Sequence, residues 1–307
     1  MTRPIVILGV FVADASFRAD RMPRMGETLL GRGFALGPGG KGSNQAVAAA
    51  RAGADVHLIT RLGRDPFADM ALRLWSEAGI TPEISQHAEH ATGAAAIFID
   101  AASGDNAIII CPGVANTISA ADLEARAELI AAAALFVTQL EQPMAAALRG
   151  LQIARAAGVA TLLNPAPAAE LPEGMLALCD YLTPNESEAA ALTGRAVTTV
   201  DDAARAAEAL IARGVGTVIV TLGDKGALFH DGAAPVHVPA FEAGPVVETT
   251  GAGDAFNGAF AAALARGEAP LAATRFGCAA AALSVTRPGT APSMPELDEI
   301  RALLARA

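Results

Sequence analysis

The chain has 307 residues, of which 52% are hydrophobic and 18% charged, so it can form a large packed core and is too apolar to be intrinsically disordered. Its 22 Lys and Arg residues against 32 Asp and Glu residues give a formal net charge of −10, and there is no basic cluster, so we expect neither a nucleic acid nor a membrane as a partner. No apolar run approaches the length of about 18 residues that a membrane span needs, and no signal peptide is evident, which together predict a cytoplasmic protein.

Short apolar runs alternate along the chain with amphipathic segments that carry helix-end signals. Strands are expected at residues 5–10, 56–59, 135–140, 159–163, 181–183 and 217–222. Helices are expected to begin at Asp65, Ser119, Pro143 and Asp201 or Asp202, and to cover residues 252–266, 270–285 and 295–306. The alternation implies right-handed crossovers and predicts an α/β fold with a doubly wound, mostly parallel sheet flanked by helices.

Two segments interrupt this alternation. Residues 14–36 contain Gly and Pro and show no convincing helix, whereas residues 92–112 alternate as two short strands around a turn at 103–106. Both segments could supply strands to one small sheet. We therefore expect a β-sheet lid made of residues 14–36 and 92–112. The α/β core is expected to comprise residues 1–13, 37–91 and 113–307.

The three cysteines are far apart in the sequence. Cys111, Cys179 and Cys278 form no CxxC pair, so neither a disulfide framework nor a zinc site is indicated. They are more typical of buried free thiols in a reducing compartment, in agreement with a cytoplasmic location.

A first glycine-rich loop covers residues 37–45. Gly37, Gly39 and Gly42 match the GxGxxG pattern, but a dinucleotide fingerprint should directly follow the first strand and lead to an acidic residue after the next. Neither condition holds, which argues against a dehydrogenase. Two interpretations stay open: a turn that lets a helix pack closely, and a ligand-facing loop. The polar residues Lys41 and Asn44 at the helix start favour the ligand-facing loop.

A second glycine-rich loop, Gly251-Ala252-Gly253, precedes an acidic residue at a helix start. Such a turn leaves several backbone N–H groups pointing outward, and together with the helix dipole they stabilise an anion, typically a phosphate. Asp254 follows directly. It either complements the helix dipole as an N-terminal acid or faces the anion site as a general base.

A third polar cluster follows the strand expected at 181–183. Asn185 and Glu188 have the spacing of a helix capping box. They also lie at the carboxyl end of a parallel strand, where ligands bind in α/β folds, and there they could organise water around a nucleotide-bound magnesium ion.

Six segments in order resemble motifs of the ribokinase-like (pfkB) family of carbohydrate kinases, and the resemblance covers nearly the whole chain. They are residues 39–46, 164–168, 183–186, 221–226, 251–254 and 286–293. The resemblance implies transfer of the γ-phosphoryl group of ATP to a hydroxymethyl group of a pentose, D-ribose first of all. The alternatives are a kinase of another furanose, a nucleoside or a keto-sugar, and a non-catalytic sugar or nucleotide sensor.

The resemblance also implies roles for particular residues, with ATP, Mg²⁺ and K⁺ as cofactors and a homodimer formed through the lids. The sugar site would comprise Asp14, Gly40, Lys41, Asn44, Glu141 and Asp254, with Asp254 as the catalytic base. The anion hole would comprise Gly251, Ala252 and Gly253. The nucleotide site would comprise Asn185, Glu188, Thr221, Gly223 and Gly226. The potassium site would comprise Glu248, Thr250, Ser284, Arg287, Gly289 and Ser293.

The sequence departs from the family pattern at two positions. Val12 occupies the place where ribokinase-type members carry an Asn whose amide binds the sugar, and valine can neither donate nor accept a hydrogen bond. Glu248 replaces the Asp that usually opens the second signature, which implies a reshaped cation site.

Overall fold

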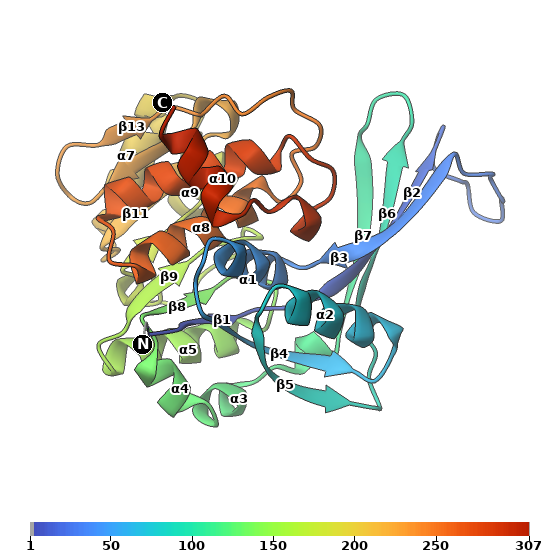
Figure 1. Ribbon diagram of the computed structural model, residues 1–307, viewed down its shortest axis with the longest axis horizontal. Helices are drawn as coiled ribbons and strands as arrows, with labels where there is room; N and C mark the ends of the chain where they lie inside the picture. Colours follow the sequence, from blue (N-terminus) through green and yellow to red (C-terminus); the bar gives the residue numbers. More distant parts are fainter. Residues whose placement is uncertain (1–2, 307) are drawn as a thin grey trace.

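Nine strands form the main sheet of the computed structural model, which describes residues 3–306 (Figure 1). Their order is β13-β12-β11-β10-β9-β8-β1-β4-β5, and only the pairs β11/β12 and β12/β13 of this sheet are antiparallel among the described residues. The strands are β1 (Ile5–Leu8), β4 (Val56–Gly63), β5 (Thr81–His87), β8 (Leu135–Thr138), β9 (Ala160–Leu163), β10 (Tyr181–Leu182), β11 (Thr217–Thr221), β12 (Ala227–His230) and β13 (Val236–Val238). Residues 1, 2 and 307 of the expected core lie outside the described residues.

Helices cover both faces of this sheet, as the alternation of patterns predicted. Successive residues of β1 point to opposite sides: Ile5 and Ile7 belong to one apolar cluster and Val6 and Leu8 to the other. The first cluster packs against α1 (Lys41–Arg51), α2 (Pro66–Glu77), α8 (Ala252–Ala265), α9 (Pro270–Ser284) and α10 (Leu297–Leu304). The second packs against α3 (Ala120–Glu124), α4 (Ala127–Ala132), α5 (Met144–Ala156), α6 (Glu186–Thr193) and α7 (Val200–Ile211). No helix within residues 3–306 is long and apolar enough to cross a bilayer.

A second, four-stranded sheet projects from one side of the main body (Figure 1). We call it the lid sheet. It has the order β3-β2-β6-β7 and comprises β2 (Val12–Ala19), β3 (Gly33–Gly39), β6 (Thr92–Asp100) and β7 (Asn106–Gly113). The two interruptions of the α/β pattern supply most of these residues, and the strands extend beyond them to Val12, Gly39 and Gly113. The small sheet expected from the pattern is therefore present.

Several expected boundaries were wrong. Helix α7 begins at Val200, because the Thr199 hydroxyl caps it by accepting from the backbone N–H of Asp202 at 3.1 Å, so Asp202 lies inside the helix. The helix that follows Ser119 is short and is succeeded by the separate α4. Strands β5, β12 and β13 were not predicted. β5 and β13 are edge strands, which lack the continuous apolar run of a central strand, and β12 lies between β11 and β13 but has only four residues.

The three cysteines were expected to be buried free thiols. All three thiols are free, and Cys179 and Cys278 are buried, but Cys111 lies on β7 of the lid sheet and is exposed.

The order of strands places a topological switch point at β1. From β1 the main sheet continues to β4 and β5 on one side, and the chain then returns to β8 on the other. In open α/β sheets, ligands bind outside the carboxyl ends of the strands at such a point. Among the predicted sugar residues, Glu141 follows β8, and Lys41 and Asn44 begin α1. The predicted nucleotide residues lie at or after the carboxyl ends of β10 and β11. The topology thus gathers segments that are far apart in the sequence.

Helices α1 and α8 approach each other closely above this edge. A Cβ atom on Gly258 would lie 2.5 Å from the Cβ atom of Ala48 and 2.5 Å from the carbonyl oxygen of Gln45. Only glycine permits this contact between α8 and α1, and it brings the first turn of α8 against the first turn of α1. The described residues also contain four 3₁₀ turns: η1 (Val114–Thr117), η2 (Leu176–Leu178), η3 (Gly223–Lys225) and η4 (Ala291–Ser293).

Candidate active site

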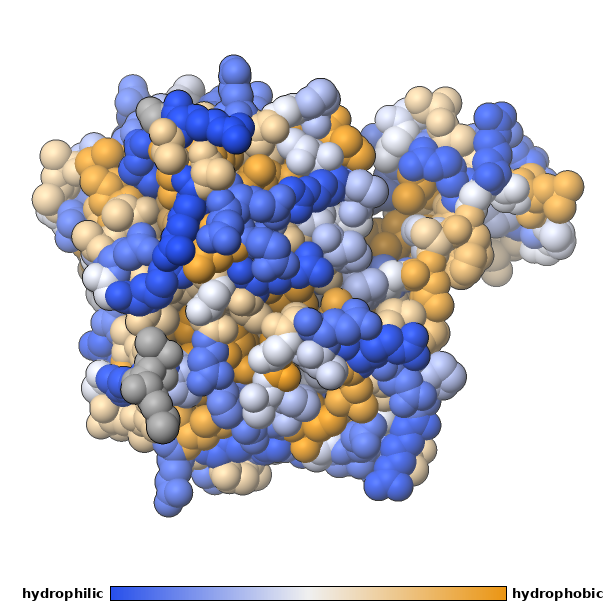
Figure 2. Space-filling view, viewed as in Figure 1, coloured by the Kyte–Doolittle hydropathy of each residue, from blue (hydrophilic) through white to orange (hydrophobic). Residues whose placement is uncertain are grey.

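A cavity of about 910 Å³ lies between the lid sheet and two loops of the main body, residues 246–250 and 288–292. Figure 2 shows the projecting lid sheet separated from the body by a hollow on this side. Asp14 of β2 lines the cavity from the lid, and Glu248, Thr250 and Gly289 line it from the loops. The cavity therefore joins the predicted sugar residue of the lid to the predicted cation segment.

Asp254 is buried in the first turn of α8, with 7% of its surface exposed. Its Oδ2 atom accepts a hydrogen bond from Nδ2 of Asn44 at 3.0 Å, and its Oδ1 atom accepts from Nε2 of Gln45 at 3.0 Å. An acid that only complemented the helix dipole would be solvated and would not need two buried amide donors. The surroundings of Asp254 are those of a carboxylate held in a defined direction.

One polar atom of the Asn44 side chain forms no hydrogen bond among the described residues. This atom is Oδ1, and it is buried. A buried acceptor left unpaired costs free energy of about 1–3 kcal/mol, and a bound hydroxyl group would relieve that cost. Asn44 thus has the geometry of a residue that contacts both Asp254 and a ligand.

Lys41 brings a positive charge to this group of acids. Its backbone N–H donates to Oε2 of Glu141 at 2.8 Å, which ties the start of α1 to the loop after β8. Burial disfavours the ammonium charge, but the charges of Asp254, Glu141 and Glu188 more than offset burial, so the pKa of Lys41 lies above its ordinary value. Lys41 is therefore protonated at neutral pH and partly neutralises a cluster of carboxyl groups.

The carboxyl groups around Lys41 all have raised pKa values, chiefly because they are buried. Burial raises the pKa of Glu141 to about 7, against the opposing effect of Lys41 and its N–H group. It raises the pKa of Asp14 to about 6. Burial also raises the pKa values of Glu188 and Asp254, although Lys41 and hydrogen-bond donors act in the opposite direction on both. Of these acids, Asp14 is the one that lines the cavity of about 910 Å³. A cluster of acids with perturbed pKa values is typical of a catalytic site.

The Gly251–Gly253 segment forms the N-terminal end of α8. Gly251 caps the helix with φ +83°, a left-handed conformation that other residues rarely adopt. The N–H groups of the first turn of a helix have no partner within the helix. A Cβ atom on Gly253 would meet no atom within 4 Å, so open space adjoins these N–H groups. The segment has the form of an anion site beside Asp254.

The predicted nucleotide residues lie together at the ends of β10 and β11. Asn185 forms an isolated parallel bridge with Thr221, and the N–H of Thr221 donates to the carbonyl of Pro184 at 2.9 Å. Asn185 and Glu188 form the expected capping box, and Glu188 is also 7% exposed and close enough to Lys41 and Asp254 to be affected by their charges. The capping-box interpretation is therefore confirmed, and the role near magnesium stays a prediction.

The remaining predicted nucleotide residues bracket a tight turn between β11 and β12. Gly223 and Gly226 both have positive φ angles, and the N–H of Leu222 donates to the carbonyl of Gly226 at 2.8 Å. This places a short loop at the same edge of the sheet as Asn185 and Thr221.

The predicted cation segment joins two loops next to the anion site. Oε2 of Glu248 accepts from the N–H of Gly289 at 2.8 Å. The buried hydroxyls of Ser284 and Ser293 donate to the carbonyls of Ala281 and Thr290. The segment is thus assembled around backbone carbonyls and N–H groups.

Two side chains of this segment have other partners or neighbours. Arg287 is directed away from the loop junction, to an ion pair with Glu299. Thr290 donates to the carbonyl of Pro38 in the lid strand β3 at 2.8 Å, and its Cα atom would lie 3.3 Å from a Cβ atom on Gly251. Thr290 thus touches both the lid and the anion site.

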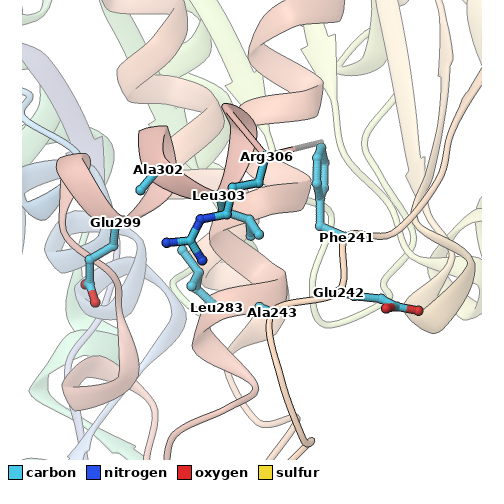
Figure 3. A pocket seen from close by; sticks show the side chains of 8 residues that line it. All are labelled: Phe241, Glu242, Ala243, Leu283, Glu299, Ala302, Leu303 and Arg306. Atoms are coloured by element: carbon cyan, nitrogen blue, oxygen red, sulfur yellow. The ribbon is translucent and has the colours of Figure 1, made fainter.

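A smaller cavity of about 470 Å³ lies elsewhere, between α10, the end of α9 and the segment 241–243 (Figure 3). Its lining includes Phe241, Leu283 and Leu303 but none of the predicted site residues. It is a separate hollow, and we assign no part of the reaction to it.

Sequence reasoning overlooked several buried polar residues around Asp254. Gln45, Asn164 and Thr183 occur inside the motifs but were given no role, and Asn257 was not singled out at all. The available signal was a polar residue on an otherwise apolar, Ala-rich helix face, as at Gln45 of α1 and Asn257 of α8. The first glycine loop does allow close packing, because a Cβ atom on Gly42 would lie only 2.4 Å from the Cα atom of Gly9, and its ligand-facing role stays a prediction.

Residues 2–297 match the model of the pfkB family of carbohydrate kinases, and the chain belongs to this family. This membership excludes the dehydrogenase alternative and makes the protein an ATP-dependent sugar kinase.

Individual relatives are similar over their whole length. The chain is 38% identical over 303 residues to a protein named deoxyribokinase from Salmonella typhi, which covers 98% of both chains. It is 37% identical over 308 residues to a protein named ribokinase from Haemophilus influenzae, which covers 100% of both. Among solved structures, Arabidopsis thaliana ribokinase complexed with ribose and ATP has a TM-score of 0.92 at 31% identity and covers 99% of both chains.

The pH dependence of stability tests the burial of Glu141. Because its pKa rises from 4.5 to about 7 on folding, its contribution to stability is complete below the lower value and is lost as the pH approaches the upper one. Between pH 5 and pH 8, the unfolding free energy of Glu141→Gln should therefore rise relative to wild type by about 2–3 kcal/mol. Denaturant unfolding of both ligand-free proteins at the two pH values measures this change, and an unchanged difference would contradict it.

Proposed function

We propose that the protein transfers the γ-phosphoryl group of ATP to a hydroxymethyl group of a pentose, with D-ribose as the first candidate substrate. The observation that carries the proposal is the buried Asp254, held by Asn44 and Gln45 beside the open N-terminal end of α8. The names of the Haemophilus influenzae and Arabidopsis thaliana relatives support the choice of sugar and of ATP.

In the proposed mechanism, Asp254 accepts the proton of the sugar hydroxyl as the hydroxyl oxygen attacks the γ-phosphorus of ATP. The bond between that phosphorus and the β,γ-bridging oxygen breaks, and ADP leaves. A raised pKa makes Asp254 a stronger base than an ordinary aspartate, and its carboxylate must be ionised to act. Lys41, Asn44, Glu141, Gly40 and Asp14 would bind the hydroxyls of the sugar. Phosphoryl transfer depends mostly on such positioning and on stabilisation of charge.

The N–H groups of the Gly251–Gly253 segment would stabilise the charge that develops on the equatorial oxygens of the transferring group. A donor of this kind contributes roughly 10²–10³ in rate in other enzymes. Magnesium bound to the ATP phosphates would neutralise part of their charge, and Asn185 and Glu188 would orient water molecules around it. Thr221, Gly223 and Gly226 would contact the nucleotide.

We propose that the lid sheet closes over the sugar, so that residues 14–36 and 92–112 act as a unit against the rest of the chain. Exclusion of water would prevent hydrolysis of ATP. Val12, Gly39 and Gly113 mark where the strands of the lid sheet meet the main body. The contact of Thr290 with Pro38 links this movement to the anion site.

The assay that tests this function measures ADP release with ATP, magnesium and D-ribose present. Asp254→Asn should lower kcat about 10²–10⁴-fold and leave ATP binding and the fold intact, because only proton acceptance is removed. Retention of more than a third of wild-type kcat would refute the role of Asp254. A wild-type protein that binds sugar or nucleotide but releases no ADP with any pentose, hexose or nucleoside would be a sensor instead.

Val12 favours a second candidate substrate, a 2-deoxypentose. Alternate residues of a strand share a face, so Val12 lies on the same face of β2 as Asp14 and Ser16, which line the cavity. Val12 is 5% exposed and offers no hydrogen bond, so a sugar hydroxyl placed against it would lack a partner. The name of the Salmonella typhi relative, deoxyribokinase, supports a sugar with one hydroxyl fewer.

The substitution Val12→Asn tests which pentose the site prefers. An unpaired buried hydroxyl costs about 1–3 kcal/mol, which is roughly 5- to 150-fold in affinity. We expect Val12→Asn to lower the KM for ribose more than it changes kcat, because it repairs binding in the ground state. Steady-state kinetics with ribose and 2-deoxyribose measure the effect. Tight ribose binding by wild type together with no effect of the substitution would show that Val12 only packs.

We propose that potassium binds at the loop junction formed by Glu248, Thr250, Ser284, Gly289 and Ser293. The hydroxyls of Ser284 and Ser293 donate their protons to backbone carbonyls, so lone pairs of their oxygens stay available to a cation. The junction adjoins Gly251, so a cation there would order the anion site. The side chain of Arg287 is engaged by Glu299, so only its backbone carbonyl could contribute. Activity should be higher in potassium chloride than in sodium chloride at matched ionic strength, and equal rates would count against the site.

We propose that the protein is a homodimer paired through the lid sheets. Large apolar side chains of the lid sheet are exposed: Phe17, Phe34, Leu36, Ile108, Ile109 and Ile110. A sheet of this size with an open face and open edges β3 and β7 would be covered by a second copy. Its mass in solution at micromolar concentration should be that of a dimer, and a monomer mass would refute the proposal.

We also propose a cytoplasmic location without nucleic acid or membrane partners. The net charge of −10 and the free thiols of Cys111, Cys179 and Cys278 support it.

A further inference from the structure

A row of buried side-chain hydrogen bonds begins at the carboxylate of Asp254. Nε2 of Gln45 donates to Oδ1 of Asp254 at 3.0 Å and also to Oδ1 of Asn164 at 3.1 Å. On its other side, Oε1 of Gln45 accepts from Nε2 of Gln139 at 2.6 Å. Gln45 thus joins α1, the loop after β8, the loop after β9 and the start of α8.

The row continues to the backbone of the anion site. Nδ2 of Asn164 donates to the carbonyl of Thr183 at 2.9 Å, and the hydroxyl of Thr183 donates to Oδ1 of Asn257. Nδ2 of Asn257 in turn donates to the carbonyl of Gly253 at 2.8 Å. The hydrogen bonds therefore start at one residue of the first turn of α8 and return to its immediate neighbour.

Each member of this row is buried. Gln45 and Gln139 have no exposed surface, and Asn164, Thr183 and Asn257 are at most 6% exposed. Buried amides lower stability unless they are fully bonded, and apolar side chains would pack the interface of α1 and α8 at less cost. A polar row at this place therefore calls for a role other than packing.

The charge of Asp254 sets the direction of the hydrogen bonds of Gln45, and the backbone carbonyls of Thr183 and Gly253 set the direction of those from Asn164 and Asn257. An ionised carboxylate only accepts, so the Gln45 amide must turn its NH₂ group toward it and its oxygen toward Gln139. The NH₂ group then faces Asn164, whose own NH₂ group must point to the Thr183 carbonyl. A protonated Asp254 could present an O–H group to neither of its two amide donors. The row as it stands is matched to the ionised acid alone.

We propose that Gln45 is a positioning residue that keeps Asp254 ionised and correctly directed, and that the hydrogen bonds from Asn164 through Thr183 to Asn257 fix the Gly253 peptide of the anion site relative to that carboxylate. The inference rests on the proposed function and deepens it. Gln45 contacts the base rather than the reacting atoms, so it acts through Asp254. The same row thereby sets the distance between the proton acceptor and the donors that stabilise the phosphoryl group.

Other charged groups face Asp254 from each neighbouring element, and they are left in place by a change at Gln45. Lys41 of α1 favours its ionised form, whereas Glu141 of the loop after β8 and Glu188 of α6 share its environment as further acids. Asp14 of β2 acts on Glu141. Removing the Gln45 donor alone should therefore raise the pKa of Asp254 against a constant background.

The substitution Gln45→Met tests the proposal, because methionine has a similar length and no hydrogen bond. The acid limb of the kcat/KM profile against pH should move to higher pH by about one to two units, the worth of one hydrogen bond to a charged group. At neutral pH kcat should fall about 10- to 100-fold, and the KM for ATP should stay within about threefold. In the Asp254→Asn background, Gln45→Met should cause no further loss, since the two residues act as a unit.

Gln142→Met is the matched control. Gln142 is also a buried glutamine next to the site, with 3% exposed, but its amide donates to Thr138 and to the carbonyl of Gln139 and does not touch Asp254. The variant Gln142→Met should lower thermal stability about as much as Gln45→Met and leave the acid limb of the kcat/KM profile at its wild-type pH. If Gln45→Met fails to fold, Gln139→Met is the alternative, because it removes the hydrogen bond that the Gln45 amide oxygen accepts. It should move the acid limb in the same direction by a smaller amount.

An acid limb of Gln45→Met that coincides with wild type, or that Gln142→Met moves equally, would overturn the proposal. This failure is distinct from failure of the proposed function, which would appear as absence of ADP release in wild type itself.

Discussion

The structure depends on the burial of one carboxylate, Asp254. A charge taken out of water without partners costs several kcal/mol, so the fold must supply compensation at this point. It does so with two amide donors from consecutive residues of α1, Asn44 and Gln45, and with the nearby positive charge of Lys41. Hydrogen bonds to charged groups are worth about 1.5–3 kcal/mol each, which is the right order to balance the cost. Since compensation is incomplete, the pKa stays raised, in agreement with the proposed role of Asp254 as a general base.

The larger features of the fold can be understood as the means of assembling this site. The reversal of strand order at β1 puts the loops after β1 and β8 on either side of one crevice. Gly258 lets α8 lie directly on α1, so that residues 210 positions apart in the sequence form a hydrogen bond. The lid sheet then brings Asp14 over the crevice. Thr290 connects the lid strand β3 to the loop beside Gly251, so the proposed sugar and phosphate sites share a contact.

Most of the architecture could be predicted from the sequence, because it depends on local signals. Apolar runs of strand length, helix caps such as Asp65 and the interruption of the α/β pattern each act within a few residues. The edge strand β5 was missed because it is half polar. The start of α7 was misplaced because Thr199 and Asp202 form a capping box, in which Asp202 takes the N3 position and not the N-cap. Motif resemblance supplied the candidate residues, and the structure brings Lys41, Asn44, Glu141, Glu188 and Asp254 within reach of one another.

The polar row behind Asp254 could not be predicted, because all of its bonds except that of Asn257 to Gly253 join residues far apart in the sequence. Gln45 lies on α1, Asn164 follows β9 and Asn257 lies on α8, and only the tertiary fold shows that Gln45 bonds to Asn164 and Asp254 and that Thr183 connects Asn164 to Asn257. A single sequence shows three unrelated polar residues in apolar surroundings.

The central claim is that Asp254 is a buried base with a raised pKa. The most direct measurement is a ¹³C NMR titration of the aspartate carboxyl groups in the ligand-free protein, with Asp254→Asn used to identify the resonance. The account predicts that the resonance lost in the variant titrates well above the ordinary aspartate value of 3.8. A carboxyl group that titrates at or below that value would contradict it, because Asp254 would then be an ordinary N-terminal acid of α8.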